Sequence, residues 1–228
     1  MNKIVGIIGG MGPEATADFY MRLVKRTPAE RDQDHLHVVI DGNPAIPDRT
    51  ESFLQKSEAT MDAVVESALR LEQMGAEILA MPCNSAHIWY DGITARLTIP
   101  LLNMIEEVFS EVRAAGLRSV GLLATSGTVQ SSLYEQYAGE VELLVPDDTE
   151  QERIHGAVYS VKAGTGSGGE GKEVLLDVIA RYRERGAGGV ILGCTEIPLL
   201  VSQADLPGFP VFDSTDILVE ATIRQAIP

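Results

Sequence analysis

The sequence predicts an α/β fold made of two similar domains, each with a parallel sheet. Short, continuous apolar runs are typical of strands that are buried on both faces. Helix-period segments alternate with these runs, as in proteins whose parallel strands are joined by crossover helices. Segments of the first half also recur in the second half, in the same order along the 228 residues. A duplicated parallel α/β unit explains all three observations.

Six apolar runs are the expected strands. They lie at residues 4–8, 37–40, 78–81, 120–123, 141–145 and 190–192. Three further segments have their apolar residues on one helical face, which predicts amphipathic helices at residues 61–69, 105–112 and 174–182. Thr149, with Glu152 three residues later, predicts a capping box at the start of another helix.

The internal repeat defines the expected domains. Three segments recur: residues 5–10 at 120–125, residues 75–83 at 186–194, and residues 99–102 at 209–212. We expect a first domain of residues 1–101 and 212–228, and a second of residues 102–211. Ligands of open parallel sheets bind beyond the carboxyl ends of the strands. Pseudo-twofold symmetry between the domains would place the active site in a cleft between them.

The charge of the chain limits the classes of partner. Its 33 acidic and 18 basic residues give a formal net charge of −15 at pH 7. Nucleic acids and anionic membranes bind basic faces, so neither is an expected partner. No apolar run reaches the ~18 residues that a membrane span requires, and the N-terminus opens on a strand rather than a secretory signal. We therefore expect a cytoplasmic protein, in which any anion site is a local feature.

Cys83 and Cys194 are the two cysteines of the chain, and each follows an expected strand at an equivalent place in the repeat. A reducing compartment would keep both as thiols. The N-terminus of a following helix would favour the thiolate form of each. Two opposed thiols suit racemisation, because one removes an α-proton and the other returns a proton to the opposite face. No cofactor is expected if the site stabilises the carbanion electrostatically.

Two other interpretations of the cysteines are weaker. Each could be a small apolar core residue, but the repeat that matches them favours a shared function. Cys83 and His87 have the i, i+4 spacing of metal ligands on a helix. No second paired motif completes such a site, so no metal is expected.

Glycine-rich turns follow the first expected strand of each half. The turn at residues 9–13 contains Met11 and Gly12, and its counterpart runs from Thr125 to Thr128. Such turns offer backbone donors to an anion, here the α-carboxylate of a substrate. A dinucleotide site is the alternative, but the glycine spacing does not satisfy G-x-G-x-x-G. A tight turn with no ligand is the other alternative.

Five motifs carry a resemblance to the aspartate/glutamate racemase family, which extends over nearly the whole chain. They are residues 9–16, 46–50, 81–87, 161–164 and 193–198. The resemblance implies a mechanism independent of pyridoxal phosphate, two α/β domains and a homodimer. It also implies that Cys83 and Cys194 are the catalytic pair. Five polar residues would then lie on the substrate: Asn84, Ser85, Thr125, Thr128 and Thr195.

Arg49 and Lys162 carry the predicted specificity for an acidic amino acid. The resemblance assigns both to the distal carboxylate of aspartate. An arginine binds a carboxylate through two parallel hydrogen bonds, and a lysine adds a mobile point charge. The alternative is that both are solvated surface residues. The glycine-rich stretch 164–171 predicts a flexible loop directly after Lys162.

The sequence favours aspartate over glutamate as the substrate. Glutamate racemases typically have a histidine where Glu196 stands, and an Asp-Ser-Gly first turn. A broad aspartate/glutamate racemase and a glutamate racemase remain alternatives. Maleate isomerase or decarboxylase chemistry would need different partners around one thiol. A non-catalytic binder of acidic metabolites would keep Arg49 and Lys162 without needing either cysteine.

Overall fold

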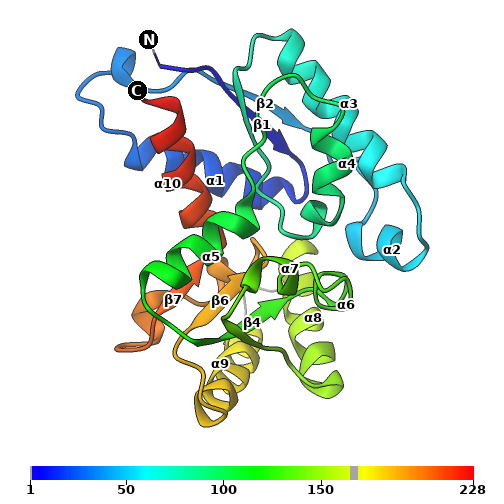
Figure 1. Cartoon of the computed structure of the whole chain (residues 1–228), viewed down its shortest axis with the longest axis vertical. Helices are drawn as coiled ribbons and strands as arrows, with labels where there is room; N and C mark the ends of the chain where they lie inside the picture. Colours follow the sequence, from blue (N-terminus) through cyan, green and yellow to red (C-terminus); the bar gives the residue numbers. More distant parts are fainter. Residues whose placement is uncertain (1, 165–168) are drawn as a thin grey trace. The chain divides into compact units, whose positions relative to one another are not determined.

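The computed structural model describes residues 2–164 and 169–228, and the chain divides into two compact units (Figure 1). The first unit comprises Met1–Met104 and Thr215–Pro228, and the second comprises Ile105–Ser214. Each unit holds one parallel sheet with helices around it, so the predicted α/β class with two parallel sheets is confirmed. None of the helices in the described ranges is long and apolar enough to cross a membrane.

The first unit contains a three-stranded parallel sheet in the order β2-β1-β3. Its strands are β1 (Val5–Gly9), β2 (Val38–Gly42) and β3 (Ile78–Ala80). Its helices are α1 (Pro13–Arg26), α2 (Arg49–Leu54), α3 (Ala59–Gln73), α4 (Tyr90–Thr94) and α10 (Ser214–Ala226), with 3-10 helices η1 (Asp32–Asp34) and η2 (Ser85–Trp89).

The second unit contains a four-stranded parallel sheet in the order β5-β4-β6-β7. Its strands are β4 (Ser119–Ala124), β5 (Glu142–Leu144), β6 (Val190–Gly193) and β7 (Val211–Asp213). Its helices are α5 (Met104–Ala114), α6 (Ser126–Gln130), α7 (Glu135–Ala138), α8 (Asp148–Lys162) and α9 (Gly169–Glu184), with 3-10 helices η3 (Ile197–Leu199) and η4 (Gln203–Asp205).

The repeat seen in the sequence reappears in the backbone pairing of the two sheets. Gly6 of β1 pairs with Leu79 of β3, and Gly121 of β4 pairs with Val190 of β6. The N–H of Leu79 donates to the carbonyl of Pro100 at 2.9 Å. The N–H of Val190 donates to the carbonyl of Pro210, also at 2.9 Å. The two units therefore share strand order and register, not only sequence motifs.

Side-chain packing on the sheets depends on a glycine in each central strand. A Cβ built on Gly6 would approach Leu79 Cδ2 to 2.6 Å. A Cβ on Gly121 would collide with the ring of Tyr182, which lies on α9. The Tyr182 hydroxyl donates to the carbonyl of Leu122 at 2.7 Å, so this ring is held against β4. Glycine at both positions lets side chains lie directly on the sheet.

The sheet of the first unit is covered on both faces. Val5 and Ile7 of β1 pack with residues of α1 and α10, whereas Ile8 packs with residues of α3. In Figure 1, α1 (blue) and α10 (red) lie side by side. Ion pairs join them, including Arg22 Nη1 to Asp216 Oδ1 at 2.6 Å. The last helix of the chain therefore completes the core of the first unit.

Two details of the sequence analysis were wrong. The capping box lies at Asp147 and Glu150, not at Thr149 and Glu152, because the helix begins two residues earlier than expected. Asp147 Oδ1 accepts the Glu150 N–H at 2.8 Å, and Glu150 Oε2 accepts the Asp147 N–H at 3.0 Å. The short strand β7 was not predicted as a strand. Only Val211 and Phe212 of this strand are apolar, and they stand between Pro210 and Asp213, so the apolar run is too short to predict a buried strand.

Candidate active site

Cys83 lies three residues beyond the end of β3, in a tight bend. Its N–H donates to the carbonyl of Met81 at 2.7 Å, and its side chain is only 4% exposed. The sulfur is a free thiol, and it lies 3.7 Å from the hydroxyl of Ser85. A neutral hydroxyl is therefore the polar group that contacts this sulfur.

The His87 ring links the backbone at Cys83 to the backbone at Met104 through hydrogen bonds. Its Nε2 accepts the N–H of Met104 at 3.2 Å, so its Nδ1 carries the proton and donates to the carbonyl of Cys83 at 2.9 Å. Burial lowers the pKa of His87 to about 4, although its carbonyl contacts oppose this. Both ring nitrogens are used in holding the chain. The described residues contain no cluster of three or more groups suited to hold a metal ion.

The glycine turn after β1 offers fewer donors than the sequence suggested. The N–H of Gly10 donates to Thr16 Oγ1 at 2.9 Å, and the Thr16 hydroxyl donates to the carbonyl of Gly12 at 2.8 Å. Thr16 therefore satisfies Gly10 from within the protein. Gly12 is the N-cap of α1, and Met11 is a buried core residue in the same apolar cluster as Cys83.

Arg49 is buried rather than solvated, which rules out the surface interpretation for this residue. It begins α2 and is 8% exposed. Its Nη1 donates to the carbonyls of Pro47 at 3.0 Å and Ile46 at 3.4 Å. Asn84, another predicted substrate residue, is buried at the start of η2. Both residues belong to the same unit as Cys83.

Cys194 directly follows β6 and has a charged partner. Its thiol donates to Glu196 Oε2 at 2.9 Å, and the Thr195 hydroxyl donates to the same oxygen at 3.3 Å. Burial raises the pKa of Cys194 well above its usual value, and the negative charge of Glu196 adds to this effect. The charge of Lys162 acts in the opposite direction on the same pKa. Cys194 is therefore held as a thiol.

At Cys194, this result corrects the expectation that a following helix terminus would favour the thiolate. The segment after Cys194 forms only the three-residue 3-10 helix η3. A helix dipole requires several aligned turns of peptide groups, which this single turn does not have. At Cys194, burial and the neighbouring carboxylate determine the protonation state.

Thr125, Thr128 and Lys162 lie in the same unit as Cys194. The hydroxyl oxygens of Thr125 and Thr128 are 3.0 Å apart at the start of α6, and both side chains are buried. Lys162 ends α8, and its Nζ lies 4.7 Å from the centroid of the Tyr159 ring. The expected flexible loop at 164–171 includes residues 165–168, which lie outside the described residues.

One face of α8 was missed by the sequence analysis. Gln151 Nε2 donates to Ser126 Oγ at 3.3 Å, and the same oxygen lies 3.2 Å from His155 Nδ1. The rings of His155 and Tyr159 stack with centroids 4.2 Å apart, and Tyr159 in turn contacts Lys162. The spacing of these residues on α8 places them on one helical face. The same spacing in the sequence could have revealed this polar and aromatic face.

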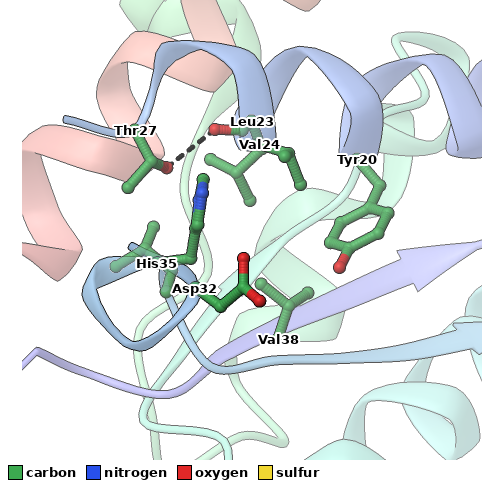
Figure 2. A pocket seen from close by; sticks show the side chains of 8 residues that line it. Tyr20, Leu23, Val24, Thr27, Asp32, His35 and Val38 are labelled. Atoms are coloured by element: carbon green, nitrogen blue, oxygen red, sulfur yellow. Dashed lines mark hydrogen bonds between the residues drawn. The ribbon is translucent and has the colours of Figure 1, made fainter. Parts of the chain in front are cut away.

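A separate cavity of about 230 Å³ lies in the first unit between α1 and β2. Figure 2 shows Tyr20, Thr27, Asp32 and His35 around it, together with apolar side chains. None of the predicted site residues lines this cavity. It is therefore not the candidate active site.

Comparison with known families identifies the chain. The family model described as Asp/Glu/Hydantoin racemase matches residues 8–222. The chain belongs to this family. It is thus a racemase-family enzyme, in agreement with the resemblance carried by its motifs.

Several relatives cover almost the whole chain. The Picrophilus torridus aspartate racemase is 34% identical, with a TM-score of 0.87 over 98% of this chain and 94% of that one. An aspartate racemase homologue from Pyrococcus horikoshii is 30% identical, with a TM-score of 0.82 over the full length of both chains. The broad specificity amino-acid racemase RacX of Bacillus subtilis is 25% identical over 225 residues, which cover 96% of each chain.

Proposed function

We propose that this protein racemises aspartate without a cofactor, with Cys83 and Cys194 as the acid/base pair. The observation that carries the proposal is that both sulfurs follow equivalent strands, β3 and β6, of two units with the same strand register. The similarity to an aspartate racemase and to an aspartate racemase homologue, at 34% and 30% identity, supports aspartate as the substrate.

The proposed reaction moves two protons and leaves the enzyme ready for the reverse direction. One sulfur, as thiolate, takes the α-proton, and the electron pair of the broken C–H bond stays on the α-carbon. The other sulfur gives its proton to the opposite face of that carbon and keeps the S–H electron pair as a thiolate. Substrate and product differ only in configuration, and the two sulfurs have exchanged protonation states.

Polar groups on both units would hold the substrate. We infer that the distal carboxylate of aspartate binds Arg49 and Lys162, because a guanidinium and an ammonium together neutralise it. The α-carboxylate would bind backbone donors of Met11 and Gly12 and the side chains Asn84, Ser85, Thr125, Thr128 and Thr195. These groups would stabilise the negative charge that grows as the α-carbon loses its proton.

A broader substrate range is the second candidate. It is favoured by the similarity to RacX, whose name describes a broad specificity, over 96% of both chains. The two candidates differ in how much they depend on Arg49 and Lys162. An aspartate racemase needs both cations for its distal carboxylate, whereas a broad enzyme turns over amino acids that have no second carboxylate.

The test is a panel of L- and D-amino acids incubated in deuterated water without pyridoxal phosphate. We expect aspartate to lose optical rotation and to gain deuterium at the α-carbon, with alanine as the matched substrate that lacks the distal carboxylate. Rapid turnover of alanine and other neutral amino acids would favour the broad enzyme. Binding of aspartate without isotope exchange would contradict racemisation. Inhibition by a metal chelator would contradict the two-thiol mechanism.

A further inference from the structure

The two cysteines have different residues at equivalent positions of the repeat. Ser85 is two residues after Cys83, and Glu196 is two residues after Cys194. Each of these side chains contacts the sulfur of its own unit: Ser85 Oγ lies 3.7 Å from Cys83, and Glu196 Oε2 accepts from Cys194 at 2.9 Å. A neutral hydroxyl therefore stands where the second unit has a carboxylate.

The Glu196 carboxylate is aimed at the sulfur and is buried with it. Glu196 is 4% exposed and Cys194 is 6% exposed, so little water screens their interaction. Oε2 also accepts the hydroxyl of Thr195, which fixes the carboxylate in this position. A thiolate beside this carboxylate would be a second buried negative charge, which is strongly unfavourable.

Two other titratable groups act on Cys194 from neighbouring segments. Lys162 of α8 has a positive charge that favours the thiolate. The buried Tyr134, just before α7, interacts with Cys194, and its pKa is raised by burial and then by the charge of that cysteine. Tyr134 is neutral near pH 7, so it adds no charge. Lys162 opposes Glu196, but it is less buried, and its effect on the pKa of Cys194 is smaller than that of the carboxylate.

We propose that Glu196 is a positioning residue that holds the proton on Cys194, so that Cys194 is the acid and Cys83 the base in the enzyme before substrate binds. This inference rests on the proposed function, in which both sulfurs act on the substrate. It makes the two halves of the site chemically unequal, although their backbones repeat. After Cys194 has given up its proton, one proton must pass through water from the Cys83 thiol to Cys194 to restore the starting state.

The inequality has a specific kinetic form. Enantiomers have equal free energies in water, so kcat/KM must be the same in both directions. Any difference in kcat between the L-to-D and the D-to-L direction must therefore be matched by an equal ratio of the two KM values, and Glu196 can change both ratios only together. We expect the wild type to have a higher kcat and a higher KM in one direction, and Glu196→Gln to bring the two directions closer together.

The direct test titrates the Cys194 thiol and needs no turnover. Cys83→Ala leaves Cys194 as the only cysteine of the chain, so its thiolate absorbance in the ultraviolet can be followed against pH. The double variant without either cysteine provides the tyrosine background. We expect Glu196→Gln in the Cys83→Ala background to lower the titration midpoint by about one pH unit or more, because the buried charge beside the sulfur is gone.

The matched control is Glu150→Gln in the same background. Glu150 is also 4% exposed and lies in the same unit, but its carboxylate accepts the Asp147 N–H at the start of α8 and pairs with Arg181. Glutamine can keep the capping contact, and the Cys194 midpoint should not change. Glu196→Asp retains the negative charge but places it farther from the sulfur. The midpoint of the Cys194 thiol in this variant should therefore lie between the midpoints of the Cys83→Ala parent and of Glu196→Gln.

The outcomes separate this inference from the proposed function. A Cys194 midpoint that is unchanged or higher in both Glu196 variants would overturn the role of Glu196. The same result would leave racemisation intact if the wild type still exchanges the α-proton of aspartate. A lowered midpoint in an enzyme that racemises nothing would support the Cys194–Glu196 pair and reject the reaction.

Discussion

The surroundings of Cys83 and of Cys194 differ far more than the backbones that carry them. Both sulfurs follow a strand that pairs in the same register with the central strand of its sheet. Cys83 lies beside the neutral Ser85, and its carbonyl accepts a hydrogen bond from His87. Cys194 instead donates to Glu196, while the charge of Lys162 acts on it from α8.

This difference shows how a duplicated fold can serve a reaction that is symmetric overall. Strand register places the two sulfurs, and it is the same in both units. Local side chains decide which proton each sulfur holds, and these side chains are not repeated. A symmetric equilibrium constrains only kcat/KM, so the two acid/base groups are free to differ in protonation.

The largest effect is expected from replacing one sulfur at a time. Cys83→Ser and Cys194→Ser should each lower racemisation about a thousandfold, because one face of the substrate then lacks its acid/base group. Each variant should still exchange the α-proton of one enantiomer for deuterium, and the two variants should select opposite enantiomers. Proton NMR in deuterated water measures this exchange. If both variants exchange the same enantiomer, the sulfurs do not work on opposite faces.

The next effect concerns His87. The second unit has no equivalent histidine, because Pro198 stands at the matching position of the repeat. The pKa of His87 is about 4 in the folded protein, below the ordinary histidine value of 6.5, so the unfolded chain binds a proton first as the pH falls. The wild type should therefore lose about 2–3 kcal/mol of unfolding free energy from this group between pH 7.5 and 4.5.

Urea denaturation at the two pH values measures this contribution. His87→Gln should be less stable than the wild type at neutral pH, because it loses the contact to Cys83 or to Met104. Its stability should nevertheless fall less on acidification, since glutamine binds no proton. An equally large acid loss in His87→Gln would assign the effect to other groups.

A smaller effect should distinguish the central strands. Gly121→Ala would force a methyl group against the Tyr182 ring, which its own hydrogen bond to Leu122 holds in place. Gly6→Ala would meet the end of the Leu79 side chain, which can turn aside, and the Cβ of Ala76 at 2.9 Å, from which the strand must move slightly. We expect Gly121→Ala to cost about 2–3 kcal/mol and Gly6→Ala about 1 kcal/mol of unfolding free energy. Equal losses in thermal or urea denaturation would contradict this ranking.

The smallest effect concerns Tyr159, whose ring lies 4.7 Å from Lys162 Nζ. Tyr159→Leu removes the ring face and about 0.5–1 kcal/mol of cation–π attraction. If Lys162 binds the distal carboxylate, the KM for aspartate should rise about two- to fivefold in this variant, with a smaller change in kcat. Tyr159→Phe keeps the ring face and should leave the KM close to that of the wild type. Steady-state kinetics of both variants test this role.

Part of the candidate site was open to prediction because it depends on local patterns. The strands after which both cysteines lie were predicted from their apolar runs, and the structure places Cys83 after β3 and Cys194 after β6. The helices at α3, α5 and α9 follow from their apolar periodicity. Burial of Arg49 was not predictable, because it depends on which backbone carbonyls reach its guanidinium.

The sequence by itself determined the α/β class, the repeat and the two strand-end cysteines, because hydrophobic period and motif order are properties of neighbouring residues. Only the tertiary structure decided that Cys194 is a buried thiol bonded to Glu196, and that His87 fastens the backbone of Cys83. Protonation depends on burial and on distances between charges. Both quantities arise only when the chain packs, so residues in equivalent positions of the repeat acquired different chemistry.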